Sequence, residues 1–402
     1  MIDKQQYGFL EKSNTQSAAL DVIHFVSCEL DQGKFVIIIL IDLQKAFDVI
    51  CHTVTIKKLE LMGFRGSTLK LLQSYLSNRS QIVCLDEVES RENKIGSGVP
   101  QGSVLGPLIY TLHVLSLKNA QLKANYFTFA DDTLLVYSGE NMSILQDTIN
   151  EDLKRYNAWL STNKLKINIK KTKYLMLKQK NKPDVQINIV LGDKPISKVE
   201  CATYLGLQID NKLNWYNHYE SLYKKIIPLI GQLFRCRSFL DESSKYKIYN
   251  SFFLTQITYM LPIYGTCNKT TFKKLETLQN KFCKILFEMN YRTPSTELYN
   301  RLKILPIKAL MQLEQAKLIY RIKNNQQKLN NEIRLRNTVH SYQTRQNLEI
   351  YYKTPRTELG DNNPLHQAFK TYNNLPDSVK NCATEGLFIK NIKKLLQHNG
   401  DQ

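Results

Sequence analysis

The amino-acid sequence predicts an α+β protein in which short strands mix with helices over the first half and helices dominate the second half. Up to about residue 209, apolar runs of strand length alternate with amphipathic stretches, whereas beyond Trp215 apolar residues recur at helical spacing almost throughout. The charge divides in a similar way: residues 1–150 carry 13 Lys and Arg against 16 Asp and Glu, and residues 151–402 carry 42 against 20. A chain of 402 residues, 43% of them apolar, has room for two or more subdomains.

The net positive charge of residues 151–402 indicates which class of binding partner to expect. An excess of positive charge over so long a region indicates a polyanion such as nucleic acid, although a solvated surface is the alternative reading for any single lysine. No stretch reaches the roughly 18 apolar residues of a membrane span, so we expect no membrane partner. The eight cysteines lie far apart without a CxxC pair, and the seven histidines form no paired motif beside them. We therefore expect reduced thiols and no zinc site.

The elements of the first half follow from apolar spacing and from turn residues. Asp31, Gln32 and Gly33 separate a helix expected at 17–30 from an apolar strand at 35–43, and Gly63 ends the next helix. Three glycines and two prolines fall within residues 98–107, which predicts a shaped loop that opens a helix at about Leu108. The other elements expected here are helices at 48–62, 67–76 and 144–161 and strands at 80–85, 94–97, 173–178, 187–191, 194–196 and 202–209. A strand, a turn and a second strand are expected over 124–137, with Asp131 and Asp132 at the bend.

The second half is predicted to be a series of helices. Residues 325–363 are polar and poor in large aliphatic side chains, which indicates flexible or extended segments. The helices expected on either side of this region cover residues 219–239, 244–254, 271–287, 295–301, 307–324 and 385–398.

Carboxylates inside apolar strands are the most informative feature of the chain. Asp42 ends the run from Val36 to Leu43, and the pair Asp131 and Asp132 interrupts the apolar run from Tyr126 to Tyr137. Burying such a carboxylate costs several kcal/mol unless a charge pairs with it, and a divalent metal is the natural partner. Two carboxylates from separate strands can hold a pair of Mg²⁺ ions for phosphoryl transfer. For the Asp-Asp pair alone, a turn or a helix cap is the more frequent explanation, and the second strand upstream reverses those odds.

Five blocks of the sequence, in order, resemble the reverse transcriptases of non-LTR, LINE-type retrotransposons. The similar blocks are Ile38–Asp48, Ser97–Pro107, Phe129–Asp132, Leu165–Lys173 and Tyr204–Gly206. The resemblance continues with Asp210, Leu213, Trp215 and His218, and residues 340–345, 355–356 and 372–376 look like the C-terminal region of the jockey-like branch.

The resemblance implies a right-hand polymerase palm, an antiparallel sheet with packed helices, with partial fingers and then an all-helical thumb and C-terminal region. The expected domains are a remnant of the fingers at 1–33, the palm with a fingers insertion at 34–200, the primer grip and thumb at 201–290, and a basic, mostly helical region at 291–402. In the family, further fingers residues precede the segment from Gln6 to Phe9, so the resemblance implies an N-terminally truncated enzyme, with an endonuclease upstream left open.

The resemblance also implies residue roles. Asp42 and Asp131 would bind metal directly, with Asp132 as a supporting ligand and the backbone carbonyl of Leu43 completing one shell. Lys171, or alternatively Lys173, would protonate the leaving pyrophosphate. The residues expected around the incoming nucleotide are Leu43, Ala46, Phe47, Gln101 and Gly102, where Phe47 would exclude a ribose 2′-OH unless it only fills the core. The primer grip would comprise Tyr204, Leu205 and Gly206, and phosphate contacts would come from Lys224, Lys225, Arg235 and Arg237.

The expected function is thus RNA-directed DNA polymerisation with two Mg²⁺ ions, which Mn²⁺ can replace. The partners would be an RNA template, a DNA primer or target, and deoxynucleotides. The family implies action in the nucleus after assembly with RNA in the cytoplasm. Two alternatives stay open: a catalytically silent RNA-binding relic of a retrotransposon polyprotein, and a group II intron-type reverse transcriptase or maturase.

Overall fold

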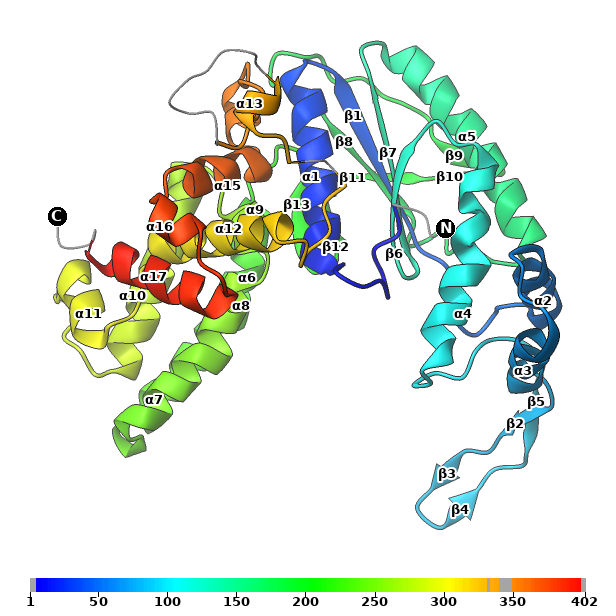
Figure 1. The fold of residues 1–402 in the computed structure, drawn as a ribbon, viewed down its shortest axis with the longest axis horizontal. Helices are drawn as coiled ribbons and strands as arrows, with labels where there is room; N and C mark the ends of the chain where they lie inside the picture. Colours follow the sequence, from blue (N-terminus) through cyan, green and yellow to red (C-terminus); the bar gives the residue numbers. More distant parts are fainter. Residues whose placement is uncertain (1–4, 331–332, 340–348, 399–402) are drawn as a thin grey trace. The chain divides into compact units, whose positions relative to one another are not determined.

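The computed structural model describes residues 5–330, 333–339 and 349–398, and the chain forms two compact units (Figure 1). The first unit holds residues 1–18 and 34–199, and the second holds residues 19–33 and 200–402. This mixture of helices and sheet confirms the predicted α+β class. The segment 1–33, predicted as one remnant of the fingers, is divided between the units because helix α1 (Thr15–Asp31) hydrogen-bonds to side chains and backbone of the second unit.

A five-stranded sheet with the order β11–β8–β1–β7–β6 is the framework of the first unit. Its central strand β1 (Phe35–Ile41) is apolar at every position and buried at six of its seven, as expected for a strand covered on both faces. It pairs antiparallel with β7 (Asp132–Gly139) on one side and with β8 (Lys173–Leu177) on the other. Strand β6 (Asn125–Phe129) forms a hairpin with β7, and β11 (Ser197–Val199) runs parallel to β8.

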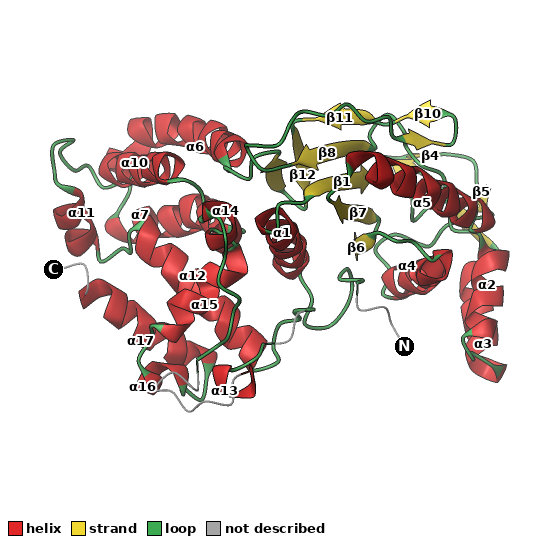
Figure 2. Ribbon diagram, turned by 90° about the horizontal axis from the view of Figure 1, so that it is seen from above, coloured by secondary structure: helices red, strands yellow, loops and turns green. Residues whose placement is uncertain are grey.

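Helices α4 (Leu105–Val114) and α5 (Met142–Thr162) cover one face of this sheet. Figure 2 shows α5 alongside the strands. Alternate side chains of β1, such as Ile37 and Ile39, pack with Leu153 of α5 in one core, because successive residues of a strand point to opposite faces. The face opposite to α4 and α5 is therefore the one on which the even-numbered residues of β1 lie.

The remaining elements of the first unit lie between β1 and β11 in the sequence and outside the five-stranded sheet. The helix predicted at 48–62 begins only at His52, because Lys45 takes a positive φ of 46° and its carbonyl accepts the N–H of Asp48, which makes a turn instead. The remaining elements outside the sheet are α2 (His52–Leu61), α3 (Gly66–Leu76), β2 (Arg79–Gln81), β3 (Cys84–Leu85), β4 (Val88–Glu89), β5 (Asn93–Ile95), the 3₁₀ helix η1 (Leu115–Ala120), β9 (Val190–Leu191) and β10 (Lys194–Pro195).

The second unit begins with the hairpin of β12 (Cys201–Tyr204) and β13 (Leu207–Asp210) and continues as helices around an aromatic core. The rings of Phe253 and Phe282 are fully buried, and their centroids lie 4.7 Å apart. The helices are α6 (Tyr216–Cys236), η2 (Arg237–Phe239), α7 (Glu242–Ile248), η3 (Tyr249–Leu254), α8 (Thr255–Thr258), α9 (Leu261–Tyr264), α10 (Lys269–Leu286), α11 (Ser295–Leu302), α12 (Ile307–Lys323), α13 (Arg336–Val339), α14 (Glu358–Asp361), α15 (Pro364–Asn373), α16 (Asp377–Lys380) and α17 (Glu385–His398).

Two sequence expectations differ from the second unit as observed. The regions 201–290 and 291–402, predicted as separate, lie in one unit. The region 325–363 holds two single-turn helices among its described residues, α13 and α14, and α15 follows with no prediction. Residues 340–345 of the C-terminal resemblance lie outside the described residues. Among the helices of the described part of the chain, none is long and apolar enough to cross a membrane.

Candidate active site

The end of β1 and the turn between β6 and β7 bring the three predicted aspartates close together. Ile41 pairs with Thr133, so the next residues along these antiparallel strands, Asp42 and Asp132, lie opposite each other. Directly opposed residues share a face, and both lie on the face away from α4 and α5, because Ile41 points into that core. Asp131 follows Ala130 in the two-residue turn that joins β6 to β7.

The raised pKa of Asp132 agrees with the closeness of the three carboxylates. Partial burial, together with the charges of Asp131 and Asp42, raises the pKa of Asp132 to about 6. The Asp132 side chain keeps contact with solvent at the start of β7, so a bound ion could reach it. Three neighbouring carboxylates repel each other, and a cation bound among them removes that repulsion. Oxygen ligands of this kind suit Mg²⁺ and other hard divalent ions.

The backbone of Asp42 and Leu43 is fixed from the other side by residues 166–168. Asn168 N–H donates to the Asp42 carbonyl and Gln44 N–H donates to the Lys166 carbonyl, both at 2.8 Å, and Leu43 forms an antiparallel bridge with Ile167. In such a bridge the N–H and C=O of the central residue point away from the partner strand. The Leu43 carbonyl therefore points away from residues 166–168, as its predicted role as a metal ligand requires.

Thr172 links the fourth sequence block to the first. Its buried hydroxyl accepts the N–H of Asp42 at 3.3 Å and donates to the Asn168 carbonyl at 3.0 Å. The two candidate acids then differ in position. Lys173 pairs with Leu40, so it shares the face of Leu40 and Asp42, whereas Lys171 lies in the turn before β8; both are exposed. Continuing the register of β1 and β8 by two residues would place Lys171 opposite Asp42, so both lysines stay candidates for the cation near the aspartates.

The predicted glycine-rich loop packs on the turn that follows Asp42. Gln101 Nε2 donates to Asp48 Oδ1 at 2.9 Å, and Gly98 N–H donates to the Ile50 carbonyl at 2.8 Å. A Cβ on Gly98 would lie 2.6 Å from the Asp48 carbonyl oxygen, so only glycine permits this approach. Gly102, with φ of +79°, has open space around its Cβ position. The first two sequence blocks therefore form one interlocked structure.

Phe47 and Ala46 have different surroundings from each other. Phe47 is half-buried, and its ring stacks on Tyr110 of α4 with centroids 4.3 Å apart and meets Phe9 edge-on at 6.1 Å. It thus packs against the core while keeping part of its ring exposed, so both readings of Phe47 are compatible with its position. Ala46, predicted at the nucleotide, is buried in the core, and its side chain is unavailable to a ligand.

Gly8 packs against the turn that bears Asp131, although the sequence analysis predicts no role for it. Residues 5–8 run beside β6: Tyr7 N–H donates to the Thr128 carbonyl at 2.8 Å, and Thr128 N–H donates to the Gln5 carbonyl at 3.0 Å. A Cβ on Gly8 would lie 2.3 Å from the backbone nitrogen of Ala130. The turn that carries Asp131 therefore rests directly on the Gly8 backbone.

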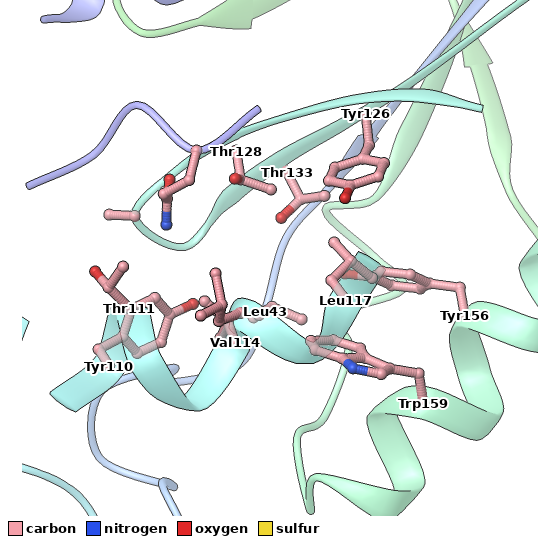
Figure 3. Close-up of a pocket in the computed structure, with 13 residues that line it drawn as sticks. Leu43, Tyr110, Thr111, Val114, Leu117, Tyr126, Thr128, Thr133, Tyr156 and Trp159 are labelled. Carbon is pink, nitrogen blue, oxygen red and sulfur yellow. The ribbon is translucent and has the colours of Figure 1, made fainter. Parts of the chain in front are cut away.

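A small pocket of about 20 Å³ lies between the sheet and the helices α4 and α5 (Figure 3). Thr128 and Thr133 line it from the strands, and Tyr110, Tyr156 and Trp159 line it from α4 and α5. Its volume is that of about one water molecule, too small for a nucleotide. The pocket therefore belongs to the packing that supports the site.

The predicted primer-grip residues form the tip of the β12–β13 hairpin in the second unit. Leu205 and Gly206 both have positive φ, 47° and 80°, which is the two-residue turn that matches the twist of a hairpin. Tyr259 holds this tip, because its hydroxyl donates to the Leu205 carbonyl at 2.7 Å and its ring lies against Gly206. Tyr204 is buried and so supports the hairpin from inside.

The predicted phosphate contacts separate into two groups. Lys224, Lys225 and Arg235 are exposed on α6. Arg237 is half-buried, lies over the ring of Phe234 at 3.9 Å and pairs with Glu288 at 3.9 Å, so its charge is already partly used within the unit.

Sequence reasoning missed three residues that build the site: Gly8, Asp48 and Thr172. Asp48 and Thr172 lie within blocks that the resemblance had marked, but neither had a role there. Gly8 lies within the segment from Gln6 to Phe9 that the resemblance had also marked, but it had no role there. Periodicity does not report such contacts, because each joins segments far apart in the chain.

Comparisons with known proteins identify the family of the chain. Residues 1–209 match the family described as reverse transcriptase (RNA-dependent DNA polymerase). The probable RNA-directed DNA polymerase from transposon X-element of Drosophila melanogaster is 26% identical over 310 residues, which cover 75% of this chain and 34% of that protein. The RNA-directed DNA polymerase from mobile element jockey of the same species is 25% identical over 290 residues, 70% of this chain and 31% of that protein.

The chain thus spans about a third of the length of these curated relatives. Among solved structures, telomerase from Candida albicans, in complex with a fragment of telomeric RNA, has 15% identity and a TM-score of 0.37, covering 77% of this chain and 53% of that chain. That score is too low to carry an argument about this protein.

Proposed function

Because the chain belongs to the reverse transcriptase family, in its LINE-type, non-LTR group, we propose that it extends a DNA 3′-OH with deoxynucleotides on an RNA template. The observation that carries this proposal is the register of β1 with β7, which sets Asp42 opposite Asp132 and next to the turn that bears Asp131. Membership in the family explains the fold. Binding of an RNA template and extension of a DNA primer follow from the same proposal.

Reverse transcriptases generally use divalent metal ions, and the residues present fit such ions. The donors are hard oxygens, burial and the neighbouring negative charges raise the pKa of Asp132, and the Leu43 carbonyl points away from the segment that anchors it. Asp42 and Asp131 would hold two Mg²⁺ ions, with Asp132 and the Leu43 carbonyl completing the shells, and Mn²⁺ would substitute. When bound, such ions activate the attacking 3′-OH and stabilise the departing pyrophosphate.

Residues of the chain would position the nucleotide and handle its proton. The exposed part of Phe47, held by stacking on Tyr110, would stand under the incoming sugar and oppose a 2′-OH. Gln101, oriented by Asp48, would present its backbone and that of Gly102 to the nucleotide. Lys171, or alternatively Lys173, would donate a proton to the leaving pyrophosphate, because both lie at the start of β8 beside the end of β1.

The second unit would bind the primer and template. Tyr204, Leu205 and Gly206 would hold the primer terminus, with the hairpin tip fixed by Tyr259. Exposed cations of α6, Lys224, Lys225 and Arg235, would contact phosphates without sequence preference. By analogy with the family, the protein would assemble with RNA in the cytoplasm and then act in the nucleus.

Primer extension with purified protein on poly(rA) and oligo(dT) in Mg²⁺ tests the proposal. We expect deoxynucleotide incorporation that falls at least 100-fold in Asp131→Asn, because a lost ligand removes the cation that stabilises the reacting phosphate. Asp193→Asn is the matched control: this aspartate is exposed in the turn between β9 and β10, and its replacement should leave incorporation unchanged.

The alternative of a silent RNA-binding relic gives a different result in the same assay. It predicts no incorporation by the unmodified chain, together with RNA binding that weakens as salt rises. Incorporation that persists in Asp131→Asn would contradict the assignment of the aspartates.

A further inference from the structure

Three potential metal ligands gather in the second unit, outside the aspartate site. His24 and Cys28 lie one turn apart on α1, and His366 of α15 meets them from a distant part of the sequence. One nitrogen from each histidine and the Cys28 sulfur all lie within 4.8 Å of one another. Imidazole nitrogen and thiolate sulfur are the ligands that Zn²⁺ prefers in proteins.

The hydrogen bonds of Asn363 determine which nitrogen of His24 is available. Asn363 is fully buried, and its Oδ1 accepts the backbone N–H of Leu365 at 3.0 Å, which identifies that atom as the oxygen. The same oxygen lies 3.1 Å from His24 Nδ1, so Nδ1 must carry the proton and donate it. Nε2 of His24 then holds the lone pair, and it is 3.8 Å from the Cys28 sulfur.

His366 also has one ring nitrogen whose lone pair is available to a metal ion. Its ring donates to the backbone carbonyl of Gly360. Its Nδ1 is buried and has no hydrogen-bond partner among the described residues. The nitrogen that donates to Gly360 is therefore Nε2, and Nδ1 carries an unused lone pair. Histidines that bind metals characteristically donate their second nitrogen to an oxygen in this manner.

The cluster opens into a cavity of about 270 Å³, which gives an ion and a water molecule a route of entry. Asp31 also lines this cavity, and its carboxylate accepts the backbone N–H groups of Arg356 and Thr357. An ordinary packed pair of histidines explains the ring contact at 5.5 Å between His24 and His366. It does not explain a buried nitrogen without a partner beside a thiol and a second imidazole.

We propose that His24 Nε2, Cys28 Sγ and His366 Nδ1 bind one Zn²⁺ ion, with water as the fourth ligand. Zinc bonds of about 2.1 Å to nitrogen and about 2.3 Å to sulfur set the ligand atoms roughly 3.5 Å apart. The sulfur and one nitrogen of each ring lie within 4.8 Å of one another here, so the side chains would have to move closer together to bind the ion. The thiol proton leaves to solvent as the Zn–S bond forms. The ion would join α1 to α15, two helices that are remote in the sequence, and so stabilise the second unit.

Cobalt titration of the full chain tests this site without reference to polymerase activity. Protein freed of metal under reducing conditions is titrated with Co²⁺, which takes tetrahedral nitrogen and sulfur sites and absorbs in the near ultraviolet when bound to thiolate. We expect one equivalent to produce that thiolate band, Zn²⁺ to abolish it, and Zn²⁺ to raise the melting temperature. His366→Gln should weaken Zn²⁺ binding at least tenfold.

Cys28→Ser should lose the thiolate band and the rise in melting temperature, while Cys267→Ser should retain both. Cys267 is the matched control, because it is a half-buried thiol of the same unit outside the cluster. Absence of the band in the unmodified chain, or its persistence in Cys28→Ser, would overturn the proposal. The titration of the unmodified chain decides the question even where a variant fails to fold.

Discussion

At the scale of single residues, the position of the aspartates depends on a neighbour without a side chain. Gly8 lies so close to the backbone of Ala130 that a methyl group would meet it at 2.3 Å. The backbone on both sides of that clash is held in place next to it, because Tyr7 N–H donates to the Thr128 carbonyl. The turn bearing Asp131 would have to move to relieve the contact.

We therefore predict that Gly8→Ala lowers primer extension at least tenfold while RNA binding changes little. The reason is that a displacement of about 1 Å at a catalytic group is costly, whereas the basic helices are untouched. Gly96→Ala is the control, since nothing lies within 4 Å of its Cβ position and its φ is not positive. Equal activity of Gly8→Ala and Gly96→Ala would show that the turn does not depend on this contact.

At the scale of elements, a buried histidine joins three helical segments beneath the sheet. His113 of α4 hydrogen-bonds with the Thr55 hydroxyl of α2 at 2.9 Å and with the Asn163 carbonyl after α5 at 3.3 Å. Burial and the nearby charge of Lys58 lower the pKa of His113 to about 4. The imidazole is therefore neutral in the folded protein throughout the physiological range.

This histidine should make stability fall on acidification. In the unfolded chain its pKa is near the ordinary 6.5, so between pH 6.5 and about 4 the unfolded state gains a proton that the folded state does not bind. The free energy of unfolding should then drop by up to about 1.4 kcal/mol for each pH unit in that window. His218 and His366 have pKa values lowered in the same direction and add to the effect.

Denaturant unfolding at several pH values measures the contribution of His113. We expect His113→Gln, which cannot titrate, to show a shallower loss of stability between pH 6.5 and 4.5 than the unmodified chain. The comparison of slopes isolates one residue from the other histidines. Parallel pH profiles for the two proteins would contradict a neutral, buried His113.

At the scale of the whole molecule, strong periodicity predicted elements well, and local turn chemistry limited their boundaries. The strand expected at 35–43 is β1 at Phe35–Ile41, and the helix expected at 144–161 is α5 at Met142–Thr162. Strand and helix edges shifted where a cap or turn intervened, as at Asn141 and Lys45. Helix α15 had no prediction, since its signal lies in the Asn363 cap and Pro364 rather than in an apolar pattern.

The candidate site was predictable to the extent that it follows from strands and sequence blocks. Asp42, Asp131 and Asp132 meet because they end or interrupt strands that pair. Contacts between remote segments, such as that of Thr172 with Asp42, had no local signal. The cluster of His24, Cys28 and His366 is of the same kind: spacing rules for zinc motifs excluded it, because only the first two ligands are near in sequence.

The most direct test of the account is to map the cation site by iron-mediated cleavage. Fe²⁺ that takes the Mg²⁺ position generates radicals that cut the backbone near its ligands. We expect cuts near both residue 42 and residue 131, suppressed together by excess Mg²⁺ and lost together in Asp131→Asn but not in Asp193→Asn. Cys28→Ser in all samples removes cleavage from the proposed zinc site. Cuts near only one of these strands, or cuts that Mg²⁺ leaves unchanged, would contradict a single site built by the three aspartates.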